Sequence, residues 1–114
     1  MTNGGSVKNS APITQYTCNG SGNQEWIYTG STMVNGDNGK CLTDGGDLAN
    51  SAPITQYTCN GSANQEWYQG GLGNGDFTIF NNYNMCMTTG GDFATSAPIT
   101  QYTCNGSGNQ LWHN

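Results

Sequence analysis

The sequence carries almost no positive charge. Its 114 residues include two lysines and no arginine, against seven aspartates and glutamates, for a formal net charge of −5. Proteins bind nucleic acids and anionic membranes through clustered lysine and arginine side chains that displace counterions. Two lysines cannot form such a cluster. The charge balance therefore excludes nucleic acid as a partner.

Aliphatic residues and long apolar runs are also scarce. Leu, Ile, Val and Phe together supply 14 residues. No segment approaches the roughly 18 consecutive apolar residues of a membrane-spanning helix, so no membrane insertion is expected. Glycine (18 residues) and asparagine (16 residues) favour turns over helix interiors. This composition predicts an all-β fold of short strands and many tight turns, with a small core that needs covalent support.

A threefold internal repeat organises the chain. The segment SAPITQYTCNGSGNQEW at 10–26 recurs with one change in each copy at 51–67 and 96–112, and the match extends upstream through a Gly-Gly pair. The chain is therefore one domain, 1–114, with first, second and third repeats of about 1–41, 42–86 and 87–114. Repeats of about forty residues are typical of a propeller blade or a trefoil lobe. Three copies are too few for a propeller, so we expect a three-lobed barrel.

Each repeat contains a clear strand signal. In Ile-Thr-Gln-Tyr-Thr-Cys, Ile and Gln alternate on one face with Thr and Tyr on the other. The Asn-Gly that follows predicts a hairpin, with a returning strand that carries the tryptophan. No window has sustained helical periodicity. Further strands are expected at 31–34, 40–43, 77–80 and 85–88.

Four of the five cysteines recur at one spacing. Cys41 and Cys59 are 18 residues apart, as are Cys86 and Cys104, which leaves Cys18 over. The repeated spacing predicts the disulfides Cys41–Cys59 and Cys86–Cys104 and hence a secreted, extracellular protein. Free structural cysteines are the alternative. With no Cys-x-x-Cys and a single histidine, we expect no metal site and no cofactor.

Three Gln-x-Trp motifs, at 24–26, 65–67 and 110–112, each follow Cys-Asn-Gly-Ser-x-Asn. Together with the Gly-Gly and Ala-Pro-Ile segments, they resemble the ricin B-type β-trefoil lectins and carbohydrate-binding modules over essentially the whole chain. The resemblance implies a β-trefoil of three pseudo-equivalent lobes, with Trp26, Trp67 and Trp112 in the core. Measured against that pattern, the trefoil is expected to be incomplete at both chain ends.

The resemblance also implies one shallow sugar site in each lobe. A tyrosine ring stacks on the sugar, an Asn-Gln pair hydrogen-bonds to its hydroxyls, and an aspartate follows the first cysteine. Here threonine stands at the aspartate position, and Asp44 comes one residue later in the second repeat alone. We therefore expect the second repeat to bind most strongly. Alternatively, the glutamines satisfy backbone groups of the turn. The candidate sugar-binding residues are Tyr16, Asn23, Gln24, Asp44, Tyr57, Asn64, Gln65, Tyr102, Asn109 and Gln110, with Asp47 and Asp92 as further carboxylate candidates.

These residues predict a non-catalytic module that binds neutral glycans weakly and multivalently, and the resemblance suggests galactosides or xylan. A glycosidase needs two carboxylates around the scissile bond. Glu25 and Glu66 each stand alone, and the third repeat has Leu111 at that position. The alternative is an extracellular structural subunit that self-associates, with neighbouring chains completing its open strand edges.

Overall fold

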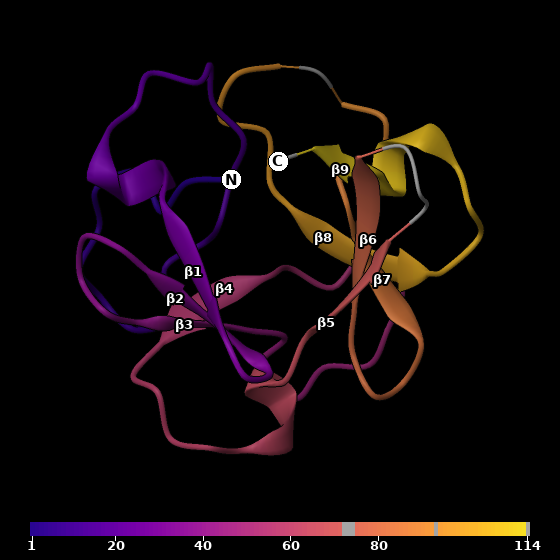
Figure 1. Cartoon of the computed structure of the whole chain (residues 1–114), viewed down its shortest axis with the longest axis horizontal. Coiled ribbons are helices and arrows are strands. Elements are labelled where there is room, and N and C mark those ends of the chain that lie inside the picture. Colours follow the sequence, from indigo (N-terminus) through magenta and orange to yellow (C-terminus); the bar gives the residue numbers. More distant parts are fainter. Residues whose placement is uncertain (72–74, 93, 114) are drawn as a thin grey trace.

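The computed structural model describes residues 1–71, 75–92 and 94–113, and it confirms an all-β fold (Figure 1). One antiparallel sheet has the order β1 (Trp26–Thr29), β2 (Thr32–Asn35), β3 (Cys41–Thr43) and β4 (Thr55–Tyr57). The other has the order β5 (Tyr68–Gly71), β6 (Asp76–Phe80), β7 (Met85–Thr88) and β8 (Thr100–Thr103), with β9 (Trp112–His113) paired to β6. The helices of the described residues are three single 3-10 turns, η1 (Gly22–Gln24), η2 (Ala63–Gln65) and η3 (Gly108–Gln110).

The three Ala-Pro-Ile segments bind one another in a closed ring. The N–H of Ile13 donates to the carbonyl of Ile54 (3.0 Å), that of Ile54 to Ile99 (3.0 Å), and that of Ile99 back to Ile13 (2.8 Å). Three copies of one sequence in one conformation can close such a cycle only around a common axis. The ring joins all three repeats and confirms the arrangement of three pseudo-equivalent lobes.

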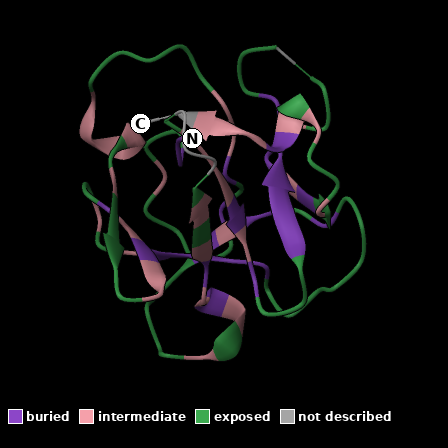
Figure 2. Cartoon of the chain, turned by 45° about the vertical axis from the view of Figure 1, so that its right-hand side comes forward, coloured by how far each residue is buried: buried purple, intermediate pink, exposed green. Residues whose placement is uncertain are grey.

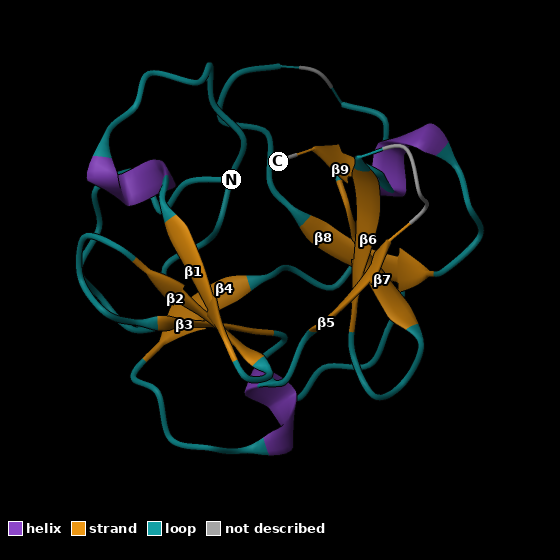
Figure 3. Cartoon of the chain, in the orientation of Figure 1, coloured by secondary structure: helices purple, strands orange, loops and turns teal. Residues whose placement is uncertain are grey.

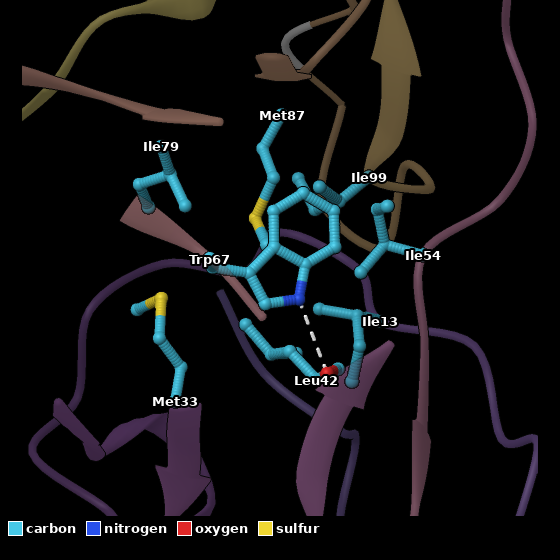
Figure 4. Close-up of a cluster of buried hydrophobic side chains, with 8 residues drawn as sticks. All are labelled: Ile13, Met33, Leu42, Ile54, Trp67, Ile79, Met87 and Ile99. Carbon is cyan, nitrogen blue, oxygen red and sulfur yellow. Dashed lines mark hydrogen bonds between the residues drawn. The ribbon is translucent and has the colours of Figure 1, made fainter. Parts of the chain in front are cut away.

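The core lies between the two sheets and is small (Figures 2 and 4). Trp67 is fully buried at its centre, and its indole N–H donates to the carbonyl of Leu42 at 3.1 Å. Side chains of both sheets and of the isoleucine ring surround it in Figure 4. The buried cluster consists of Trp67 with Ile13, Met33, Leu42, Ile54, Ile79, Met87 and Ile99.

The prediction that all three tryptophans are buried is correct only for Trp67. Trp26 and Trp112 are half-buried, although each makes the equivalent indole hydrogen bond, to the carbonyls of Met1 (3.0 Å) and Met87 (3.3 Å). The difference follows from position. Trp67 is enclosed between the sheets, whereas the other two pack against the cluster from the starts of β1 and β9.

The four further strands expected from the sequence are present as β2, β3, β6 and β7, with ends within one residue of the predicted ones. The prediction of a hairpin at Asn-Gly is wrong. After β4 the chain makes a turn in which Asn60 Oδ1 accepts the N–H of Ser62 (3.0 Å) and Gly61 has φ +74°, and it then enters η2. β4 pairs with β3 and β5 with β6, so the Asn-Gly segment belongs to a longer loop.

Both predicted disulfides are confirmed. Cys41 is bonded to Cys59 and Cys86 to Cys104, so each bridge ties a strand, β3 or β7, to the chain just beyond its neighbour. Cys18 is exposed and forms no disulfide. Within the described part of the chain, no helix is long and apolar enough to cross a membrane.

Candidate functional site

Three shallow surface pockets recur around the molecule, and we name each after its tyrosine. The Tyr16, Tyr57 and Tyr102 pockets have volumes of about 350, 260 and 290 Å³. Each is lined by eight of the described residues, and these occupy the same eight positions of the repeat in all three pockets. Seven come from one repeat, and the eighth, a serine, comes from another. One site chemistry is therefore built three times.

The tyrosines are displayed at the surface as the strand alternation predicts. Tyr57 and Tyr102 are each 42% exposed and Tyr16 is 51% exposed, whereas Gln56 and Gln101, one residue earlier, are fully buried. None of the three tyrosine hydroxyls makes a hydrogen bond to a residue that the structure describes. Each pocket therefore offers an accessible aromatic ring and a phenolic hydroxyl that can donate and accept.

The asparagines of the pocket wall use their side-chain oxygens within the loop. In the Tyr57 pocket, the Ser62 hydroxyl lies 2.5 Å from Asn60 Oδ1 and 2.6 Å from Asn64 Oδ1, so the two amide oxygens share its one proton. The Nδ2 groups of the two asparagines have no hydrogen-bond partner among the described residues, and the other two pockets repeat this arrangement. The wall is therefore rich in amide donors that a ligand oxygen can use.

The glutamines hold the loop, as the structural alternative expected. Gln65 Nε2 donates to the carbonyl of Thr58 (3.0 Å), and its Oε1 accepts the N–H of Asn60 (2.9 Å). Gln24 and Gln110 make the same two bonds. All three glutamines line their pockets, but their amides are engaged with the loop backbone, so their part in a sugar site is to position the wall.

The structure corrects the place expected for Asp44. Asp44 is 2% exposed and is not among the residues that line the Tyr57 pocket. Its Oδ1 accepts the N–H of Gly46 (2.8 Å) and its Oδ2 accepts Asn81 Nδ2 (3.1 Å). Burial raises the pKa of the Asp44 carboxyl above its ordinary value, and the two hydrogen bonds oppose that shift. Asn3 and Thr89 close the equivalent turns of the other repeats.

Threonine takes the pocket position that the resemblance assigned to aspartate. Thr43 lines the Tyr57 pocket, and its hydroxyl donates to the carbonyl of Asn64 (3.0 Å) and accepts the N–H of Gly45 (2.9 Å). Asp47 and Asp92 also serve turns, by accepting the N–H groups of Ala49 and Ala94. None of the described residues lining the three pockets is acidic.

Sequence reasoning missed five kinds of pocket residue. In the Tyr57 pocket these are Ser10, Thr43, Gly45, Thr55 and Asn60. Asn60 could have been found from its place between the tyrosine and the Asn-Gln pair, since all three copies carry it. Across the described residues, no three His, Cys, Asp or Glu side chains are grouped to hold a metal ion.

Comparisons with known proteins agree with this architecture. The sequence matches the family model of the ricin-type beta-trefoil lectin domain over residues 1–67 and 31–114. The structure is similar to the designed threefold-symmetric protein ThreeFoil, with a TM-score of 0.90 and 24% identity over 98% of this chain and 86% of that chain.

Two further solved structures come from known organisms. The exo-beta-1,3-galactanase 1,3Gal43A of Clostridium thermocellum has a TM-score of 0.84 and 30% identity over 96% of this chain, which spans 25% of the galactanase. The ricin B-like lectin of Macrolepiota procera, solved with lactose, has a TM-score of 0.75 and 19% identity over 90% of this chain and 77% of the lectin. A comparison with curated proteins finds no match. These findings confirm the β-trefoil fold.

Proposed function

The chain belongs to the family of ricin-type β-trefoil lectin domains, and on that premise we propose that it binds neutral glycans weakly at three equivalent pockets and does not cleave them. The observation that carries the proposal is the threefold repetition of one pocket. All eight lining positions have the same residue type in each copy, including an accessible tyrosine and two asparagines with free amide N–H groups.

The chemistry of the pocket suits a sugar. The ring of Tyr57 offers an apolar surface for the C–H face of a pyranose, and the Nδ2 groups of Asn60 and Asn64 can donate to sugar oxygens. A shallow site with one ring and a few hydrogen bonds supports a dissociation constant from millimolar to high micromolar, on the order of −4 to −6 kcal/mol. Galactosides are the first ligands to test, because one relative is a galactanase and one neighbour was solved with lactose. Xylan is the second.

We propose that the domain is not an enzyme. Glycoside hydrolysis needs two carboxyl groups roughly 5 to 10 Å apart on either side of the scissile bond. The pocket linings that the structure describes contain no carboxyl group, Asp44 is enclosed in its turn, and Glu66 is bonded to Tyr68 and Asn82. The galactanase is an enzyme, but this chain corresponds to a quarter of its length.

We propose a secreted location on the strength of the two disulfides. Such bridges persist in oxidising compartments and are rare where thiols are kept reduced. Two bridges also suit a domain that, in its described residues, has one small cluster of buried apolar side chains.

The three pockets are expected to bind with similar affinity. The earlier reason for ranking the second repeat first was Asp44, which lies outside the pocket. With that difference removed, Tyr57→Ala and Tyr102→Ala should weaken binding to about the same degree. Asp44→Asn should leave binding unchanged.

The test is retardation of the protein on columns of immobilised lactose, β-1,3-galactan and xylan. Each single tyrosine substitution should reduce retardation, and the triple variant Tyr16→Ala/Tyr57→Ala/Tyr102→Ala should abolish it. Since these side chains are exposed, circular dichroism and thermal unfolding should show that the variants remain folded. Folded, unchanged protein that none of the columns retards, and that a glycan array does not bind, would contradict the proposal. A mass measurement in dilute solution would then test the self-association alternative.

A further inference from the structure

We infer that a serine from another repeat completes each pocket and hydrogen-bonds to the bound sugar; this inference rests on the proposed glycan binding. Ser10 of the first repeat lines the Tyr57 pocket of the second. Ser51 of the second repeat lines the Tyr102 pocket, and Ser96 of the third lines the Tyr16 pocket. The assignment runs once around the molecule and returns to its start.

Main-chain pairing between repeats brings each serine to its pocket. The N–H of Ser10 donates to the carbonyl of Gln56 at 2.7 Å, and Gln56 directly precedes the pocket tyrosine Tyr57. The same bond, at the same length, joins Ser51 to Gln101 and Ser96 to Gln15. Because the bond uses the serine N–H, it fixes the position of the residue and leaves the side chain free.

The backbone of these serines is in a conformation that favours glycine. Ser10, Ser51 and Ser96 have φ of 67°, 68° and 71°, in the left-handed region where a Cβ atom is strained. Glycine would adopt this conformation without that cost, and the chain places glycine at many other left-handed positions. Strained residues that persist beside a pocket indicate that their side chain has a use there.

The serine side chains do not serve the fold through hydrogen bonds of their own. All three serines are exposed, and none of their hydroxyls bonds to any residue that the structure describes. Other hydroxyls nearby are satisfied within the fold: Ser62 bonds to Asn60 and Asn64, and Thr43 to Asn64 and Gly45. A free hydroxyl can both donate and accept, which matches the hydroxyl groups of a sugar.

The consequence is that no repeat contains a whole site. Each pocket joins seven residues of one repeat to a serine of another, so site formation requires the ring of Ile13, Ile54 and Ile99 to close. A repeat folded by itself would present its tyrosine without the serine.

The experiment isolates single pockets. A Tyr57-only protein carries Tyr16→Ala and Tyr102→Ala, and a Tyr102-only protein carries Tyr16→Ala and Tyr57→Ala. Retardation is measured on whichever column, lactose, β-1,3-galactan or xylan, retards the unchanged protein most. Ser10→Ala should weaken binding of the Tyr57-only protein on the order of fivefold, the loss expected for one neutral hydrogen bond. In the Tyr102-only protein, Ser51→Ala should weaken binding more than Ser10→Ala does. Ser6→Ala, a serine outside the pockets, is the matched control.

A glycine substitution separates ligand contact from a structural role. Ser10→Gly in the Tyr57-only protein should reduce binding as Ser10→Ala does, while the thermal midpoint stays equal or rises because the left-handed strain is relieved. Loss of binding that tracks a fall in the midpoint would overturn the ligand role. Unchanged retardation after Ser10→Ala would overturn the serine assignment alone. A folded Tyr57-only protein that is not retarded at all would overturn the proposed function and this inference with it.

Discussion

Asp44 is a buried carboxyl in a turn that the other repeats close with neutral residues. Asn3 accepts the N–H of Gly5 in the first repeat, and Thr89 accepts that of Gly91 in the third. In the second repeat the carboxylate accepts Gly46 N–H and Asn81 Nδ2, yet burial is the dominant influence and raises the pKa of Asp44. The charge therefore costs stability at a place where the turn itself does not require it.

Replacing Asp44 by asparagine should change how stability depends on pH. A carboxyl whose pKa is higher in the folded protein binds its proton more tightly when folded. Its contribution to stability is therefore greatest in acid and falls as the pH rises from the unfolded value near 3.8 through the raised folded value. Asp44→Asn removes this dependence. As the pH rises through that interval, the free energy of unfolding of the variant should therefore increase relative to that of the unchanged protein. Urea unfolding at a series of pH values measures it, and parallel profiles would contradict the assignment.

At the scale of elements, a glutamine at one position of the repeat fastens a loop of another repeat. Gln101 of β8 is fully buried, and its Nε2 donates to the carbonyls of Asp47 (2.6 Å) and Ala49 (3.0 Å) in the second repeat. Gln15 makes the equivalent bonds to Asp92 (2.6 Å) and Ala94 (2.8 Å), but it is more exposed. Gln15 and Gln101 occupy the same position of the repeat and make the same pair of hydrogen bonds, but they differ in how deeply they are buried.

Gln101→Met should destabilise the protein more than Gln15→Met. Methionine keeps the length of the side chain but removes the two donors, and loop carbonyls that lose a buried partner cost about 1 to 3 kcal/mol. At Gln15, water can replace the amide, so the loss there should be smaller. Urea unfolding of the two variants side by side is the measurement. Equal losses would show that burial of this position does not matter.

Across the whole molecule, periodicity was the most reliable guide. The spacing of the repeats predicted the two disulfides, the exposure of the tyrosines and most of the strands, because these depend on short-range alternation and on equivalence between copies. The strand expected at 13–18 is an exception, because the first repeat makes only isolated bridges there. Asp44 was misplaced because a shift of one residue in the turn gives the side chain other neighbours: Thr43 lines the pocket, whereas Asp44 accepts hydrogen bonds from Gly46 and Asn81 and is not part of the lining. The serines could not be assigned from sequence, because contact between repeats depends on how the ring closes.

The three pockets lie on one compact body, which gives a prediction for the intact molecule. Each contains residues of a 3-10 turn, and Figure 3 shows these turns at separated points of the rim of a molecule of 32 × 31 × 24 Å. One weak contact on a polymer or dense surface then makes the next contact intramolecular.

Binding of the intact protein should therefore depend on how densely the ligand is displayed. On surfaces with graded densities of immobilised lactose, apparent affinity should rise on the order of a hundredfold from sparse to dense ligand. On a dense surface, a molecule bound through one pocket meets further ligand at a high effective concentration, so a second pocket binds readily. The Tyr57-only protein should bind free lactose with the same dissociation constant per site, yet respond little to density. Surface plasmon resonance at each density, with titration of free lactose as the reference, separates the two quantities. The apparent affinity of the Tyr57-only protein could instead depend on ligand density as strongly as that of the intact protein. That result would mean that the density dependence comes from association between protein molecules, and that the three pockets do not act together.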